Sequence, residues 1–261
     1  MKTTVTFIAA ILFATLTFAQ VANVAEHELT GNENEALTEQ NGNLNTALAQ
    51  SYGSHNHAYQ LQYGNLNITE VYQGGDENEA FQIFNGNRNH ALLIQLGEEN
   101  QSNMIVNGNR NDILVSQDGF VNISQIEING SLNATMVEQF GAFNNSLVDI
   151  DGNGNWTWAT MSGSNNSVEQ IVNGNLNYAE ATVIGAGNTA FENQNGNGNS
   201  IILGQFGDGN IASISQDGEG NQSYSGQFGA GNSLLVSQDG EGNNNNNEQS
   251  GAFNMANINQ K

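Results

Sequence analysis

Polar and apolar residues alternate along most of this chain in short runs of six or seven residues. In one such run Ile113, Val115 and Gln117 occupy every second position, and the residues between them are mixed in character. A period of two predicts β-strands, because successive side chains of a strand point to opposite faces of its sheet.

A glycine recurs every eleven residues from Gly31 to Gly251 without an insertion, and an asparagine stands three residues after each of its 21 copies. A fixed short period is typical of solenoids, in which one repeat buries its apolar face only by stacking on its neighbours. Each unit divides into a Gly-x-x-Asn turn and one strand. Glycine adopts positive φ without steric cost, so the repeat glycines are assigned to turns; they include Gly42, Gly86, Gly130, Gly174, Gly207 and Gly229.

An eleven-residue period also describes a right-handed coil of α-helices. Glycine costs a helix up to about 1 kcal/mol per residue, and every unit contains one. The residues between the glycines are rich in Val, Ile, Thr and aromatic residues, which favour strands. The sequence therefore predicts an all-β fold.

Residues five, seven and nine after each glycine share one strand face, and only Glu192 of the 26 acidic residues falls in this set. We take this face as buried. Its ninth position is often glutamine, and a buried amide is costly unless its donor and acceptor are both matched. Strands stacked about 4.7–4.8 Å apart match them in a continuous ladder. The predicted ladder residues are Gln40, Gln62, Gln73, Gln95, Gln117, Gln139, Gln194, Gln205, Gln216, Gln227, Gln238 and Gln249, with Asn45, Asn89, Asn133, Asn177, Asn210 and Asn232 at the turns.

A larger period of 22 residues is visible as well. The segment 204–221 recurs as 226–243, and in the middle of the chain a glutamine position alternates with an apolar one. One full coil therefore has two strands. We predict a β-solenoid of about ten two-stranded rungs over residues 31–261, with residues 20–30 as a short segment leading into the first strand.

Residues 1–19 have the form of a secretory signal: Lys2, an apolar run over 5–14, and small residues before Gln20. The apolar run is too short to span a bilayer. The expected mature chain is exported. It keeps three basic residues against 26 acidic ones, a net charge of about −23. This charge argues against nucleic acid as a partner and against insertion of the mature chain into a membrane, and it favours solubility before self-association.

Cysteine and proline are both absent. An exported chain without cysteine has no disulfide framework. A chain without proline keeps every backbone N–H available for a strand ladder.

Candidate catalytic or metal-binding residues are few. Catalysis needs unlike residues that converge, whereas nearly every position here copies the one eleven residues before it. The histidines show no metal-ligand spacing, and the acidic turns around Asp217 and Asp239 lack the nine-residue pattern of calcium-binding β-rolls. We expect no enzyme, no cofactor and no metal site, with solvated carboxylates at these turns.

The pattern Gln-x-Gly-x-x-Asn-x-Ala-x-x-x-Gln resembles the curlin repeats of bacterial curli subunits. It reads Gln40-Asn41-Gly42-Asn43-Leu44-Asn45-Thr46-Ala47 near the start and Gln205-Phe206-Gly207-Asp208-Gly209-Asn210-Ile211-Ala212 near the end. The resemblance covers essentially all of the expected mature chain. The chain departs from the common pattern in having about twice the usual number of repeats, and in replacing the second glutamine of the motif, as at Ile214 and Val236.

The resemblance implies a secreted subunit that passes an outer-membrane secretion pore and polymerises on a nucleator subunit into extracellular, cell-surface amyloid fibres of a biofilm. Major subunit, nucleator and accessory protein remain alternatives. A further alternative is a monomeric β-solenoid that serves as a surface adhesin or an ice-binding type of rod. That function requires a flat outer face with regular rows of threonine, and the outward positions are too mixed to supply one.

Overall fold

The computed structural model describes residues 22–261, so the predicted signal peptide, residues 1–19, lies outside the described part. These residues form two parallel sheets of eleven strands each. The first sheet contains β1 (Val24–Asn32), β3 (Thr46–Ser54), β5 (Ile68–Asp76), β7 (His90–Glu98), β9 (Asp112–Phe120), β11 (Ala134–Ala142), β13 (Trp156–Ser164), β15 (Tyr178–Ala186), β17 (Ser200–Asp208), β19 (Gln222–Ala230) and β21 (Asn244–Ala252). The second contains β2 (Glu35–Asn41), β4 (His57–Tyr63), β6 (Glu79–Asn85), β8 (Gln101–Asn107), β10 (Ile123–Asn129), β12 (Asn145–Asp151), β14 (Ser167–Asn175), β16 (Thr189–Asn197), β18 (Ile211–Glu219), β20 (Ser233–Glu241) and β22 (Met255–Gln260).

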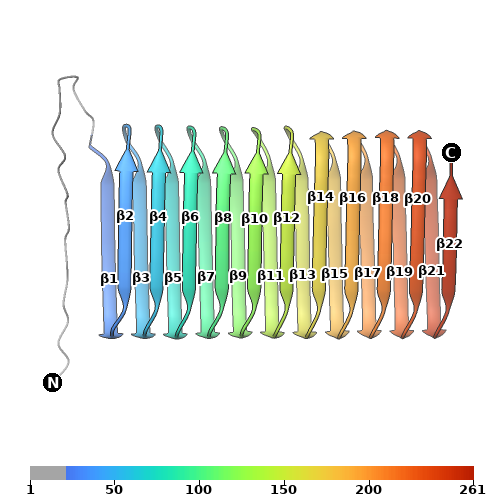
Figure 1. Ribbon diagram of the computed structural model, residues 1–261, viewed down its shortest axis with the longest axis horizontal. Helices are drawn as coiled ribbons and strands as arrows, with labels where there is room; N and C mark the ends of the chain where they lie inside the picture. Colours follow the sequence, from blue (N-terminus) through green and yellow to red (C-terminus); the bar gives the residue numbers. More distant parts are fainter. Residues whose placement is uncertain (1–21) are drawn as a thin grey trace.

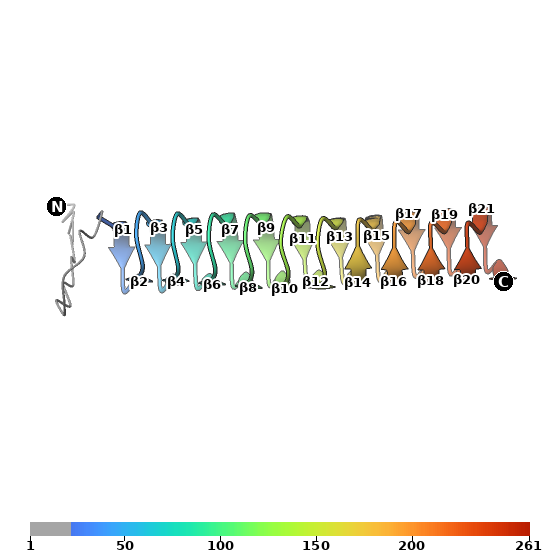
Figure 2. The ribbon, with the colours of Figure 1, turned by 90° about the horizontal axis from the view of Figure 1, so that it is seen from above.

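Each strand pairs in parallel with the strand two places later, in a register of 22 residues. Thr46 of β3, for example, pairs with Ile68 of β5, and Asn145 of β12 pairs with Ser167 of β14. One coil is therefore one strand of each sheet, and the coils stack in a straight row whose two layers are seen in Figures 1 and 2. The predicted all-β solenoid with a 22-residue coil is confirmed.

The solenoid has eleven coils, where the sequence predicted about ten. The additional coil begins with β1, Val24–Asn32, most of which lies in the segment 20–30 that we expected only to lead into the first strand. No glycine of the repeat precedes β1, which is why the period did not reveal it. None of residues 22–261 forms a helix that could cross a membrane.

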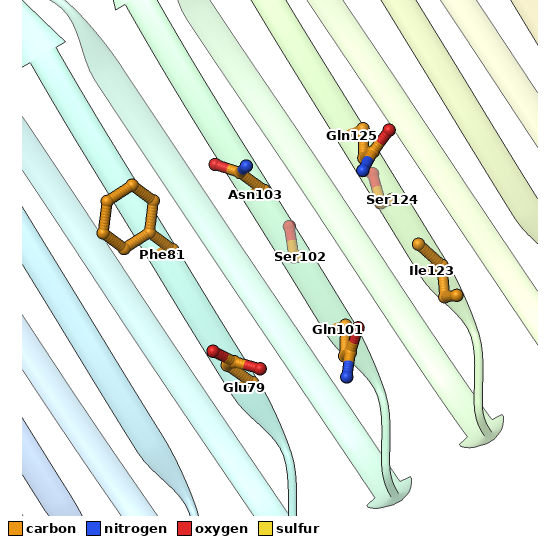
Figure 3. Close-up of a pocket in the computed structure, with 8 residues that line it drawn as sticks. All are labelled: Glu79, Phe81, Gln101, Ser102, Asn103, Ile123, Ser124 and Gln125. Atoms are coloured by element: carbon orange, nitrogen blue, oxygen red, sulfur yellow. The ribbon is translucent and has the colours of Figure 1, made fainter.

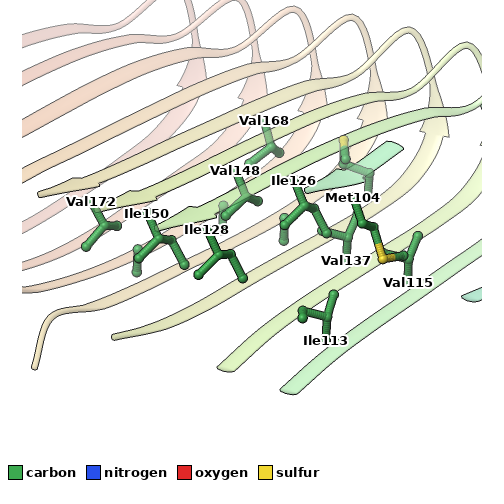
Figure 4. Close-up of a cluster of buried hydrophobic side chains, with 14 of the residues drawn as sticks. Met104, Ile113, Val115, Ile126, Ile128, Val137, Val148, Ile150, Val168 and Val172 are labelled. Carbon is green, nitrogen blue, oxygen red and sulfur yellow. The ribbon is translucent and has the colours of Figure 1, made fainter. Parts of the chain in front are cut away.

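The core lies between the two sheets and is filled by alternate side chains of every strand. In β3 the inward residues Ala47, Ala49 and Ser51 are fully buried, and the residues between them are partly exposed. Figure 4 shows the aliphatic middle of the core, where Met104, Val115 and Val137 belong to strands of both sheets. Small residues predominate at the first inward position, because two sheets that turn tightly into each other leave little room beside the turn.

The turn glycines are required by the stacking as well as by their backbone angles. Gly174 has φ of 121°, and a Cβ placed on it would lie 1.9 Å from the carbonyl oxygen of Gly196 one coil further on. The turns of successive coils thus touch backbone to backbone. An insertion or a side chain at this position separates two coils, which accounts for a period without slips.

Replacing Gly174 by alanine tests this contact. We expect Gly174→Ala to lower the free energy of unfolding by about 3 kcal/mol or more, because the new methyl group meets backbone and the φ is forbidden to alanine. Gly209→Ala is the matched control: Gly209 has φ of 64° and open space where its Cβ would stand, so the cost is about 1 kcal/mol. Urea denaturation of both variants measures the difference; equal losses would contradict the stacking argument.

Candidate functional site

The repeat asparagines form one column along each edge of the solenoid. Asn67 donates from its backbone N–H to Asn45 Oδ1 at 3.0 Å and from Nδ2 to the same oxygen at 3.2 Å. Asn45 Nδ2 donates in turn to the carbonyl of Gly64 at 2.8 Å. Each buried amide is thus satisfied by the coils before and after it. The same arrangement holds Asn89, Asn133, Asn177, Asn210 and Asn232.

The glutamines of the first sheet form two buried ladders. Each Nε2 donates to the Oε1 of the glutamine one coil further on, at 2.8–3.0 Å, through Gln73, Gln95, Gln117 and Gln139 and again through Gln205, Gln227 and Gln249. The same Nε2 also reaches carbonyl oxygens, as Gln95 does to Glu79 at 2.9 Å and Asn100 at 3.0 Å. The ladders therefore join coil to coil and also one sheet to the other.

The second sheet carries the complementary set near the two ends of the rod. Gln40 donates to Gln62 at 2.8 Å, and a ladder at 2.8–3.0 Å runs through Gln194, Gln216, Gln238 and Gln260. Between them the same position holds hydrocarbon, namely Phe84, Val106, Ile128, Ile150 and Val172. A ladder that begins above a valine lacks a donor, and the Oε1 atoms of Gln194 and Gln205 accordingly have no partner within the described residues.

Three kinds of ladder residue were missed in the sequence. Gln260 was missed although it stands at the ninth position after Gly251. Gln60, Gln82 and Gln170 stand at the seventh position, where apolar residues prevail, and all three are buried. A second, exposed asparagine column, from Asn43 to Asn65 at 3.1 Å and onward, occupies the residue directly after the glycine. The 22-residue spacing of identical amides was the signal for all of them except Gln170, whose counterparts one coil away are Val148 and Glu192.

Glu192 is the one acidic side chain on the buried face. It is fully buried in β16, with Gln170 Nε2 donating to its Oε2 at 2.8 Å, and its Oε1 has no partner within the described residues. Burial, with a smaller contribution from Glu180, raises the pKa of this carboxyl to about 8. Near neutral pH the folded chain therefore favours the protonated acid.

The two ends of the rod leave these columns unfinished. Asn254 donates to Asn232 Oδ1 at 3.0 Å, and no residue of the described part donates to Asn254 Oδ1. Gln260 accepts from Gln238 and has no glutamine beyond it, while Gln40 begins the same column at the other end. Figure 1 shows β1 and β22 at opposite ends of the row, and each pairs with one strand among the described residues.

The outer surface of the described part carries open hollows. A hollow of about 240 Å³ lies on the second sheet over β6, β8 and β10, between Phe81, Asn103 and Gln125 (Figure 3). It is open to solvent, and Glu79 is the titratable side chain that lines it. Residues 22–261 contain no group of three or more His, Asp or Glu side chains placed to hold a metal ion.

Three histidines lie beside carboxylates one coil away on the surface. His55 is 2.9 Å from Glu33, and His90 is 2.8 Å from Asp112. His57 is 3.4 Å from Glu35. His27 faces the interior of the first coil, 2.8 Å from Thr38 Oγ1, and burial lowers its pKa.

Comparison with known proteins gives one family. The model described as Curlin associated repeat matches residues 31–59, 193–218 and 207–240. A search of curated proteins found no match. The matched stretches lie towards both ends of the solenoid, and the strands between them continue the same 22-residue register.

Breaking one ladder tests its contribution to stability. We expect Gln95→Leu to lower the free energy of unfolding by about 2–3 kcal/mol, because it removes the buried donor to Gln117 and the buried acceptor of Gln73. Gln125→Leu, an outward glutamine on β10, is the control and should change stability by less than about 0.5 kcal/mol. Urea denaturation midpoints of the two variants measure the difference. Similar losses of stability in both variants would show that the ladder makes no contribution of its own.

Glu192 predicts a pH-dependent stability with a definite sign. Below its ordinary pKa of 4.5 the carboxyl is protonated in both states, so its burial carries no ionisation cost. As the pH rises towards 8 the unfolded chain releases the proton and the folded chain holds it, so stability is lost. Glu192→Gln should therefore be more stable than the parent by on the order of 3 kcal/mol at pH 7, at about 1.4 kcal/mol per pKa unit.

Denaturation of freshly desalted, dilute protein at pH 4 and pH 8 checks this difference. Comparing the two proteins at each pH cancels the titration of the other carboxylates. The difference in the free energy of unfolding between Glu192→Gln and the parent should vanish at pH 4. A difference that is the same at both pH values would contradict the role assigned to Glu192.

Proposed function

Because this chain belongs to the curlin associated repeat family, we propose that it is a secreted structural subunit that stacks end to end into extracellular curli-like amyloid fibres. One observation carries the proposal. Among residues 22–261, the donors without a partner at each end of the rod lie in the same columns as the acceptors without a partner at the other end.

The match between the ends follows from the register. Gln260 lies ten whole coils after Gln40, and Asn254 ten whole coils after Asn34. A second molecule placed one coil beyond the first therefore sets its Gln40 Oε1 against Gln260 Nε2, and its Asn34 N–H against Asn254 Oδ1. Every column of amides then continues across the junction in the direction it already has.

The backbone makes the same match. The N–H of Ser233 donates to the carbonyl of Asn254 at 2.8 Å, and the N–H of Gln222 donates to Asn243 at 2.8 Å. Met255 and Asn244 occupy the corresponding positions one coil later, where the chain has no further coil to accept from them. Unpaired strand edges of this kind are templates for another chain, and solenoids that remain monomeric cover them with polar, atypical caps.

The remaining properties of the chain suit such a subunit. Its predicted signal peptide and its net charge of −22 before cleavage favour an exported chain that stays dispersed until it meets an end. The proposed partners are further copies of the chain, a nucleator subunit and an outer-membrane secretion pore, and the proposed role is structural, in adhesion and biofilm matrix. Nucleic acid and the membrane interior are not proposed as partners.

A monomeric adhesin or ice-binding rod is the competing function. It would need a regular outer face, but the outward column of the second sheet runs through Leu37, Tyr59, Phe81, Asn103 and Gln125. Such a column changes size and polarity from coil to coil. It does not supply the repeated flat array that this function requires.

A proline at the last coil tests end-to-end stacking. Met255 is 83% exposed, and its N–H makes no bond within the solenoid, so Met255→Pro removes a donor only from the junction. We expect the variant to fold as a monomer and to extend sonicated parent fibres at least tenfold more slowly than the parent chain does.

Met255→Thr keeps the N–H and serves as the control, which should elongate normally. Thioflavin fluorescence and electron microscopy follow the growth. Undiminished elongation by Met255→Pro, or a parent chain that remains monomeric with sonicated seeds, would overturn the proposed function.

A further inference from the structure

One edge of the solenoid carries a continuous row of leucine and arginine. It consists of the turns that lead from each second-sheet strand to the next first-sheet strand. The row, here the leucine–arginine edge, contains Leu44, Leu66, Arg88, Arg110, Leu132 and Leu176, at consecutive coils apart from a glycine at 154. Leu132 is 59% exposed and Leu176 is 73% exposed, so this edge presents leucine side chains and two positive charges beside the exposed asparagine column that begins at Asn43.

The opposite edge carries the opposite charge in the same coils. There the turns from first-sheet to second-sheet strands present Asp76, Glu77, Glu98 and Glu99, which together line a surface hollow of about 140 Å³. We call this the acidic edge. Directly beyond these carboxylates Phe120 and Phe143 form an edge-to-face pair with ring centres 5.4 Å apart, so the acidic group is followed by an apolar one.

The charged residues of both edges have a backbone conformation that is unfavourable for any residue with a side chain. Arg88 and Arg110 have φ of 60° and 59°, and Glu77 and Glu99 have φ of 59° and 55°. A left-handed conformation costs a residue with a side chain roughly 1–2 kcal/mol. Later coils place glycine at the same two columns, at 187, 209 and 231 and at 198, 220 and 242. Glycine would therefore form these turns at a lower conformational cost, so the presence of charged side chains there needs another explanation.

Electrostatics within one molecule does not provide that explanation. Among residues 22–261 the ion pairs all involve histidine, and neither arginine takes part in one. The two guanidinium groups stand one coil apart, about 4.8 Å by strand spacing, as do the carboxylates of Glu77 and Glu99. Like charges stacked in this way repel, so each edge by itself is destabilised.

The two edges match in height along the rod. Arg88 follows Glu77 by eleven residues and precedes Glu99 by eleven, which places it half a coil from each. Arg110 likewise follows Glu99 by eleven residues, and Leu132 precedes Phe143 by eleven. A second rod set beside the first in the same direction, without rotation, therefore presents its carboxylates to the arginines and its phenylalanines to Leu132.

We propose that the leucine–arginine edge of one molecule binds the acidic edge of a second copy of this chain, with the rods side by side and parallel. The contact is heterologous, so it repeats across a ribbon of rods and does not close at a dimer. Copies of such an acidic chain repel one another at long range. In the coils from β5 to β12, the contact between these two edges is the place where opposite charges of two neighbouring rods face each other. Sideways binding is separate from end-to-end stacking and does not depend on it.

The absence of cysteine allows a direct test by cross-linking. Ser131 lies beside Leu132 on the leucine–arginine edge, and Ala142 lies beside Phe143 on the acidic edge, half a coil higher. Two single-cysteine chains, Ser131→Cys and Ala142→Cys, are mixed under mild oxidation. The mixed disulfide should exceed either like-with-like disulfide at least fivefold. Both positions lie in the middle of the rod, so end-to-end contact does not bring them together.

Charge exchange identifies the groups responsible. Placing Arg88→Glu and Arg110→Glu in the Ser131→Cys chain should lower the mixed disulfide at least fivefold, and adding Glu77→Arg and Glu99→Arg to the Ala142→Cys chain should restore it. Glu127→Arg with Glu169→Arg, on the outer face of the second sheet, makes the same change in net charge and should restore nothing. Arg88→Gly with Arg110→Gly adopts the turns of the later coils and should also lose the cross-link while it remains folded.

The cross-linking results distinguish contact between the two edges from the alternatives. Equal amounts of mixed and like-with-like disulfides, or no restoration by the exchanged carboxylates, would overturn the proposal. Restoration by the variant on the sheet face would show that net charge, and not the two edges, controls the contact.

Discussion

The structure depends on one interaction, the hydrogen bond between groups that are 22 residues apart and one coil apart in space. Backbone and side-chain amides use it alike, and in the interior it is the main way for an amide to be satisfied. Asn67 and Gln95 illustrate this, because each donates to one neighbouring coil and accepts from the other. A single coil has neither partner, so stability belongs to the stack and not to the repeat.

The other features of the chain follow from keeping that bond in register. Glycine at the turns lets backbones approach to contact, and the lack of proline leaves every N–H available. The interior is narrow, and it mixes amide ladders with columns of Val, Ile and Phe84. Where a ladder meets such a column an acceptor is left over, as at Gln194 and Gln205. The stack thus tolerates a few unpaired atoms at the beginnings of ladders.

Much of this fold was predictable from the sequence because the constraints are local and repeated. The glycine period fixed the turns, the alternation fixed the faces, and the 22-residue recurrence fixed the number of strands in a coil. The first coil escaped because no repeat glycine marks its start, since residue 20 is a glutamine.

Other features required the three-dimensional structure. The sequence marks Glu192 as an exception on the buried face, but its raised pKa follows from full burial beside Gln170. The opposition of Arg88 and Glu77 is hidden in the sequence, since residues eleven apart lie on opposite edges of the rod. Only the coil geometry shows that they stand at nearly the same height.

Helical reconstruction of the assembled protein by electron microscopy tests the central claim most directly. If the bonds within the solenoid continue from one molecule to the next, successive molecules should be related by a rise of about 53 Å, eleven coils at about 4.8 Å each, with unbroken strand spacing across the junction. A rise of a single strand spacing, or a gap between molecules that interrupts the ladders, would contradict the account.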